Sequence, residues 1–162
     1  MLNVIKHNNK DKIEEFIDKT SIFLREFYTQ IVPDNNISLL EMYNNPKTIS
    51  DEIKNKQYQY FLISYENTNI GNAVVQQDGN LLNIAQIFIL KKYRKKKLSY
   101  KIIKELRCLA SNQSLEGLKI AIFISNIKLK KIVEKWGFKK ADSIARYIGD
   151  GMYLYEDIYT LT

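Results

Sequence analysis

Apolar residues change their spacing in the second half of this chain. Leu81–Leu90 is almost entirely apolar, with Asn83 and Gln86 as its only polar residues. An apolar run of this length, rich in isoleucine, predicts a strand that is covered on both faces. After Ser99 the apolar residues recur at helical spacing, at positions 102, 103, 106, 109 and 110. We therefore predict a buried strand, a short loop and an amphipathic helix, which Ser99 either caps or joins within the first turn.

The remaining strands and turns follow from alternation and from turn residues. The strands are predicted at residues 2–6, 58–66, 70–77, 118–125, 138–146 and 152–161. Turns are predicted at residues 67–69, 78–79 and 149–151, where Asn, Asp and Gly gather. The last two strands should therefore form a hairpin.

The remaining helices are predicted from apolar stripes and capping residues. The first helical region starts at Asn8 or Asn9 and ends before Pro33, with the stripe Ile13, Phe16, Ile17, Phe23, Leu24 and Phe27. Further helices are predicted at residues 39–43, from Thr48 or Ser50 to Lys54, and from Asn126 to a C-cap at Gly137. Cys108, in the helix after Ser99, is expected to be a small buried residue.

This order of elements predicts the fold class. Hairpins give antiparallel strand pairs, and the two later helices return the chain to neighbouring strands. We expect an α+β domain with a mixed, mostly antiparallel central sheet of about six to seven strands, flanked by about four helices. At 162 residues, the chain should form a single domain, residues 1–162.

Six cations in seven residues separate the predicted strand from its helix, namely Lys91, Lys92, Arg94, Lys95, Lys96 and Lys97. A strand that leads directly into a helix directs the unpaired amides of the helix, and the positive end of its dipole, at a ligand above the strand end. Added cations suit a phosphate-rich ligand. The alternative is a solvated lysine-rich turn. The net charge of +7 is uneven, with −3 in residues 1–78 and +10 in residues 79–162.

The segment resembles the central motif of the GNAT-type N-acetyltransferases, Arg/Gln-x-x-Gly-x-Gly/Ala. Here it reads Arg94-Lys95-Lys96-Lys97-Leu98-Ser99, with Lys97 and Ser99 in place of the two glycines. Downstream, Asn126, a helix and Trp136-Gly137-Phe138 resemble the Asn-helix-Gly-Phe segment of that family. The resemblance spans roughly residues 58–162 and implies a GNAT-like fold.

The resemblance implies an acyl-CoA site, with acetyl-CoA or another acyl-CoA as co-substrate. The loop amides of Lys95–Ser99 would hold the pyrophosphate. The edge of the strand at Ile87, Phe88 and Ile89 would pair with the pantetheine amides, and Asn126 would bind the cofactor arm. Lys95–Lys97, or Lys130 and Lys131, would meet the 3′-phosphate. The implied cofactor-binding residues are Ile87, Phe88, Ile89, Arg94, Lys95, Lys96, Lys97, Leu98, Ser99 and Asn126.

The resemblance does not supply catalytic groups. Many relatives carry a carboxylate where this chain has Ala85, and a tyrosine acid where it has Val133. Proton transfer would then pass through water or through a tyrosine such as Tyr28, Tyr147 or Tyr153. The catalytic residues are left unassigned.

Three functions stay open at this point. The leading one is an N-acyltransferase, an enzyme that moves an acyl group from acyl-CoA to a primary amine on a small molecule or peptide. The amine would bind near the acidic half, at Glu26, Asp34, Glu41, Asp51 and Glu52. The second is a catalytically degenerate binding or regulatory protein of the same fold. The third is a nucleic-acid partner, for example in a tRNA-directed transferase, because Tyr93 stands among the lysines.

Composition limits the remaining partners. A single cysteine and a single histidine make a metal site unexpected, so no metal is assigned. No run approaches the ~20 apolar residues of a membrane span, and the N-terminus lacks a signal-peptide core. We expect a cytoplasmic protein without a membrane partner. A homodimer stays open.

Overall fold

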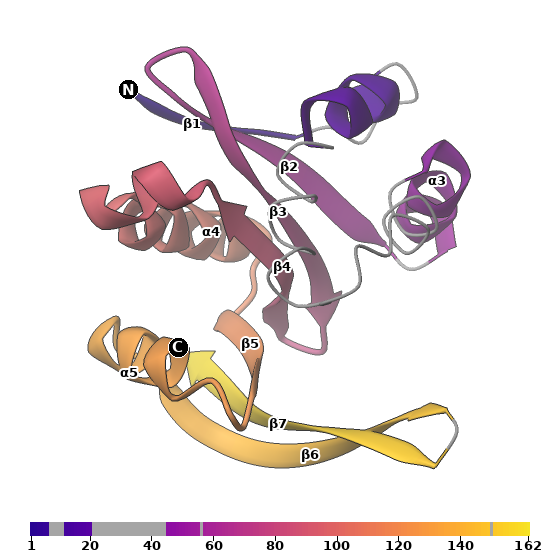
Figure 1. Cartoon of the computed structure of the whole chain (residues 1–162), viewed down its shortest axis with the longest axis vertical. Coiled ribbons are helices and arrows are strands. Elements are labelled where there is room, and N and C mark those ends of the chain that lie inside the picture. Colours follow the sequence, from indigo (N-terminus) through magenta and orange to yellow (C-terminus); the bar gives the residue numbers. More distant parts are fainter. Residues whose placement is uncertain (7–11, 21–44, 56, 150) are drawn as a thin grey trace. The chain divides into compact units, whose positions relative to one another are not determined.

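The computed structural model describes residues 1–6, 12–20, 45–55, 57–149 and 151–162. Figure 1 shows the course of the chain. The strands are β1 (Leu2–Lys6), β2 (Tyr58–Tyr65), β3 (Thr68–Asp78), β4 (Leu81–Ile89), β5 (Gly117–Phe123), β6 (Lys139–Gly149) and β7 (Met152–Leu161). The helices are residues 12–20, α3 (Pro46–Asn55), α4 (Leu98–Asn112), α5 (Ile127–Lys135) and the 3₁₀ helix η1 (Lys91–Lys96).

The seven strands form one sheet in the order β1-β2-β3-β4-β5-β7-β6. The pairs β1–β2, β2–β3, β5–β7 and β6–β7 are antiparallel, whereas β4 and β5 are parallel. The parallel pair requires a crossover, which α4 supplies. The predicted α+β class, with a mixed and mostly antiparallel sheet, is confirmed.

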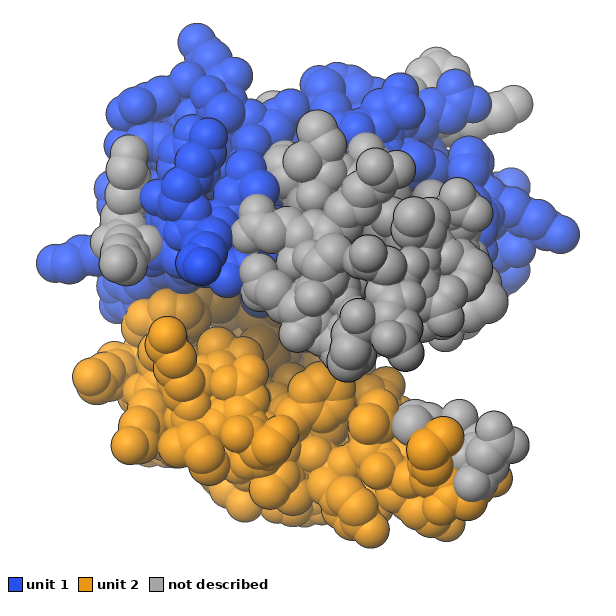
Figure 2. Space-filling model, viewed as in Figure 1, with its two compact units in different colours: residues 1–76, 86–102 blue, residues 77–85, 103–162 orange. Residues whose placement is uncertain are grey.

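Internal contacts divide the described chain into two compact units (Figure 2). Unit 1 consists of residues 1–76 and 86–102, and unit 2 of residues 77–85 and 103–162. The division passes through β4 and α4, so each of these elements contributes to both units. Unit 1 contains η1 and the start of α4, whereas unit 2 contains α5 and the β6–β7 hairpin.

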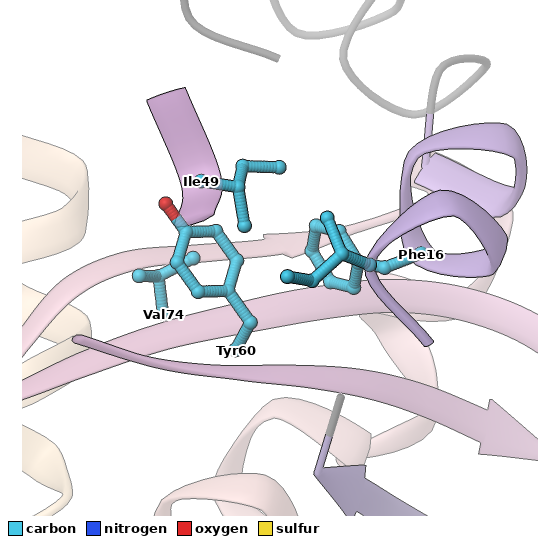
Figure 3. Packing of buried hydrophobic residues seen from close by; sticks show 5 residues of the cluster. Phe16, Ile49, Tyr60 and Val74 are labelled. Atoms are coloured by element: carbon cyan, nitrogen blue, oxygen red, sulfur yellow. The ribbon is translucent and has the colours of Figure 1, made fainter. Parts of the chain in front are cut away.

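One hydrophobic cluster in unit 1 packs two helices, the one at residues 12–20 and α3, against β2 and β3. Its buried members are Ile13, Phe16, Ile49, Tyr60 and Val74. Figure 3 shows four of them pointing toward one another. The rings of Phe16 and Tyr60 meet edge to face, with 5.3 Å between their centroids. Burial, together with a hydrogen bond to Glu52, raises the pKa of Tyr60 above its ordinary value.

The predicted helix around Ser50 begins earlier than expected. Asn45 accepts a hydrogen bond from the Thr48 N–H (2.9 Å), and Pro46 is the first helical residue of α3. Proline is favourable there because a first-turn N–H needs no intrahelical partner. The Asn45-Pro46 pair is therefore the capped start of the helix. The Phe23–Phe27 part of the first predicted stripe and the predicted helix at residues 39–43 lie outside the described residues.

Two burial predictions were wrong. Cys108 is exposed, because a helix turns about 100° per residue and this places it opposite buried Leu106 and Ala110. Phe88 and Ile89 are both buried, so the two faces of β4 are covered there as predicted, but Ala85 is exposed. The first half of β4 therefore has one well-covered face, formed by Leu82 and Ile84, among the residues that the structure describes.

Other boundaries are close to those predicted. Leu98 rather than Ser99 begins α4, so Ser99 lies in the first turn. The strand predicted at 118–125 is β5, which ends at Phe123. Gly137 follows the C-cap of α5 with φ +95°, as expected of a C-terminal glycine. Within the described part of the chain, no helix is long and apolar enough to cross a membrane.

Candidate functional site

The second half of β4 has an edge that pairs with no other strand in the described structure. Parallel pairing joins Leu81–Ile84 to Gly117–Ile120 and ends there, although both strands continue. The carbonyl of Phe88 is directed to β3, since a Cβ built on Gly71 would lie 2.0 Å from that oxygen. Backbone groups alternate between the two edges of a strand, so those of Ile87 and Ile89 are directed to the unpaired edge.

Arg94 ties η1 to the end of β4. Its Nε donates to the Ile89 carbonyl (2.6 Å), and its guanidinium carbon lies 5.4 Å from the centroid of the Phe88 ring. The Leu90 N–H donates to the Ile70 carbonyl of β3 (2.8 Å), at a position where the β2–β3 register shifts. These contacts fix the direction in which the chain leaves the sheet.

Lys97 joins η1 to α4 in the left-handed conformation, with φ 55° and ψ 15°. Glycine adopts this conformation without strain, whereas other residues lose about 1–2 kcal/mol there. The GNAT signature has glycine at the position of Lys97. The turn therefore keeps the backbone shape for which glycine is suited, and adds an exposed cation.

The start of α4 is suited to an anion. The first amides of any helix lack intrahelical partners, and the first turn of α4 contains no acidic residue that would satisfy them. Leu98 is 1% exposed and anchors this turn, while Ser99 is half-buried. The cations of the preceding η1 segment include the exposed Lys91, Lys92 and Arg94. Lys95 and Lys96 belong to η1 as well.

Asn126, the remaining predicted cofactor residue, lies in unit 2 and caps α5. Its side-chain oxygen accepts a hydrogen bond from the Leu129 N–H (3.1 Å). The amide oxygen is thus used within the helix turn, whereas the amide nitrogen is a donor. Its predicted contact with a cofactor arm stays a prediction.

The two positions where relatives carry catalytic groups differ in burial. Ala85 is exposed on β4, and Val133 is 1% exposed on the inner side of α5. Tyr147 and Tyr153 are exposed near the end of the β6–β7 hairpin, with ring centroids 5.3 Å apart. Tyr28 lies outside the described residues.

A buried charge network in unit 2 was not anticipated. The carboxylate of Asp157, which is 4% exposed, forms ion pairs with Lys130 (2.5 Å) and Lys140 (2.7 Å). It also accepts a hydrogen bond from the hydroxyl of Ser143 (2.6 Å). Lys130, then Lys140 and Ser143, hold the pKa of Asp157 well below its usual range. Lys130 had been considered for the 3′-phosphate, but it contacts this carboxylate.

Asn72 was also not anticipated as a candidate site residue. It lies in β3 beside Gly71 and is 1% exposed, and its side-chain oxygen has no hydrogen-bond partner within the described structure. Such an oxygen can accept a hydrogen bond from a ligand or a water molecule. The sequence signal was an amide between Gly71 and Ala73, at the head of the apolar run Ala73–Val75.

These features define an α+β domain with an unpaired central strand edge that leads into a cationic helix start. The sequence model of the acetyltransferase (GNAT) domain matches residues 28–152. The chain therefore belongs to the GNAT acetyltransferase family. No curated protein matches the sequence.

Solved structures of acetyltransferases share this fold. The PaiA N-acetyltransferase of Thermoplasma acidophilum, in complex with coenzyme A, is 15% identical, with a TM-score of 0.69 over 97% of this chain and 98% of its own. An N-acetyltransferase from Staphylococcus aureus is 18% identical, with a TM-score of 0.68 over 99% and 96%. The ribosomal-protein-S18-alanine N-acetyltransferase of Escherichia coli is 14% identical, with a TM-score of 0.66 over 99% and 93%.

Proposed function

We propose that this protein is an N-acyltransferase that moves an acetyl or other acyl group from acyl-CoA to a primary amine. The observation that carries the proposal is the continuous path from the unpaired edge of β4, through η1, to the start of α4. Membership in the GNAT family supports it. A solved structure with the same fold contains coenzyme A.

Each part of the acyl-CoA fits a different part of this path. The pantetheine amides would pair with the free edge at Ile87 and with the N–H of Ile89, whose carbonyl is held by Arg94. The pyrophosphate would bind at the first amides of α4, from Leu98 and Ser99. Lys91, Lys92 and Lys95–Lys97 would supply the counter-charge.

The reaction would require no covalent enzyme intermediate. The amine nitrogen attacks the thioester carbonyl, a C–N bond forms, the C–S bond breaks, and the coenzyme A thiolate takes up a proton. Ala85 offers no carboxylate to remove the proton of the amine, so that proton would pass to water. Catalysis would then depend on positioning the two reactants.

Calorimetric titration with acetyl-CoA tests the proposal directly. We expect binding, and weaker binding by coenzyme A whose 3′-phosphate has been removed. Replacing Lys91 and Lys92 with Gln should weaken binding, whereas replacing exposed Lys47 and Lys54 of α3 with Gln should not. Absence of heat with acetyl-CoA at millimolar concentration would contradict the proposal.

The second candidate is a GNAT-fold protein that binds acyl-CoA without turnover. The observation that favours it is the apolar residue at both usual catalytic positions, Ala85 and Val133. Release of the coenzyme A thiol in the presence of a panel of amines separates the two. Amine-dependent thiol release eliminates the second candidate, and binding without release supports it.

A further inference from the structure

Three acidic residues of unit 2 are engaged by side chains of the same unit. Asp157 pairs with Lys130 and Lys140, and Glu156 pairs with Arg146 (3.1 Å). Both carboxylates are buried. Glu134 accepts a hydrogen bond from the Tyr159 hydroxyl (3.1 Å). Other cations of the unit, on the surface of α5, take part in none of these pairs.

Three of these surface cations form a row on α5. Lys128, Lys131 and Lys135 are all exposed. At about 100° and 1.5 Å per residue they lie within an arc of about 60° and extend over about 10 Å of the helix. Lys130, on the opposite side of the same helix, is turned inward to Asp157 and is 13% exposed. The row is therefore the outer face of α5.

One member of the row is unfavourably placed without an anion, whereas Lys135, in the last turn, is favourably placed. Lys128 lies in the first turn of α5, which contains no acidic residue. A cation there is repelled by the positive end of the helix dipole. A bound anion would relieve this repulsion and would at the same time neutralise the row.

We propose that the outer face of α5, formed by Lys128, Lys131 and Lys135, binds the phosphate backbone of a nucleic acid. This activity goes beyond the proposed acyl transfer and uses none of the residues of the path from β4 through η1 to α4, although Lys131 was one of the two α5 lysines considered for the 3′-phosphate. Each strand of a duplex carries one phosphate per about 3.4 Å of the helix axis, so the row, placed along that axis, spans about three of them.

A membrane surface fits this helix less well than a nucleic acid. Interfacial helices insert an apolar face between the lipid head groups. The apolar residues of α5 are turned into the unit instead, since Leu129 and Ile132 are half-buried and Val133 is buried. Ile127 is the one exposed large apolar residue of this helix.

The test is fluorescence anisotropy of the whole chain with a short labelled RNA hairpin and with single-stranded DNA. We expect binding that weakens steeply between about 50 and 200 mM salt. Lys128→Gln, Lys131→Gln and Lys135→Gln together should weaken it about tenfold or more at low salt, and should reduce the slope of log K against log salt by about 2. Preference for the RNA or for the DNA identifies the natural ligand class.

Two further variants make the result specific. Gln at exposed Lys12, Lys47 and Lys54 lowers the net charge equally and should leave binding unchanged. Arg at the three α5 positions keeps the charges and should preserve binding. Circular dichroism checks that each variant is folded.

Several results would overturn the proposal. They are absence of nucleic-acid binding at low salt, an equal loss of nucleic-acid affinity in the α5 triple Gln variant and in the control triple Gln variant, or binding only to anionic phosphatidylserine vesicles. An equal loss of acetyl-CoA affinity in the α5 triple would assign the row to the cofactor instead. Because acetyl-CoA binding is measured separately, failure of the proposed acyl transfer and failure of this surface are distinguishable.

Discussion

The β4–α4 and β5–α5 turns, both within the described residues, lead from a strand into a helix and differ in what satisfies the helix start. At β5–α5, the side chain of Asn126 accepts the Leu129 N–H, and Lys130 is drawn inward by Asp157. At β4–α4, cations precede the helix, and Lys97 provides a left-handed link. An asparagine side chain thus caps one of the first amides of α5, whereas the first turn of α4 contains no acidic residue and follows a run of cations.

The difference follows from where each turn is anchored. The β4–α4 turn is held by its own backbone, through the Arg94 bond to Ile89 and the Leu90 bond to Ile70. The start of α4 takes no part in these two hydrogen bonds. The comparison teaches that the same local topology can be held by a side-chain cap or by backbone contacts, and that the residues of the turn decide which.

The largest effect is expected from Gly71→Ala. The new methyl group would lie 2.0 Å from the Phe88 carbonyl, so β3 and β4 must separate. We expect the free energy of unfolding to fall by about 3 kcal/mol in urea denaturation. Gly117→Ala is the matched change at the start of β5, where the new methyl group would lie 2.1 Å from the Leu161 carbonyl. Both should destabilise the fold, but Gly71→Ala should weaken acetyl-CoA binding more, and equal affinities would contradict the assignment.

The next largest effect is expected from Asp157→Asn, which removes the anchor of α5. Lys130 and Lys140 lower the pKa of Asp157, so the stabilisation is present above the ordinary pKa of about 3.9 and is lost as the pH falls below it. The variant should melt well below the wild type at neutral pH. The difference in Tm should shrink as the solution is acidified, and a difference independent of pH would refute the role of this carboxylate.

Arg94→Ala should weaken acetyl-CoA binding about tenfold, because η1 loses its charged hydrogen bond to the Ile89 carbonyl. Arg94→Lys should have an intermediate effect, since an ammonium keeps the charge but not the planar fork. Arg107→Ala removes an equal charge from an exposed position on α4 and serves as the control in the same titration. Equal affinities of the two alanine variants would show that charge alone matters.

Asn126→Ala should lower the free energy of unfolding by about 1 kcal/mol through loss of the cap. Asn126→Asp retains an acceptor for the Leu129 N–H and should leave stability nearly unchanged. If Asn126 also donates to the cofactor arm, the aspartate variant should bind acetyl-CoA less tightly. Unchanged affinity in that variant would limit Asn126 to capping.

The smallest effect is expected from Lys97→Gly, which should raise the free energy of unfolding by about 0.5–1 kcal/mol. Glycine relieves the left-handed strain, partly offset by the greater freedom of the unfolded chain. Lys97→Ala keeps the strain while removing the same charge, so the difference between the two variants in urea denaturation isolates the backbone effect. A glycine variant no more stable than the alanine variant would contradict the strain.

The sequence by itself determined the order of the described elements and the position of the cationic turn. Hydrophobic periodicity and capping residues are local properties, so β4, α4 and α5 were located to within one or two residues from Leu81, Ser99 and Asn126. The same locality misled the prediction for Cys108, which shares a helix with buried residues but faces solvent.

Only the tertiary structure decided which distant groups meet. Periodicity states which face of an element is apolar, but it does not name the partner of a charge. Asp157 therefore could not be matched to Lys130, nor the Arg94 side chain to the Ile89 carbonyl. The left-handed conformation of Lys97 was likewise hidden, because a backbone dihedral follows from how the turn is held on both sides.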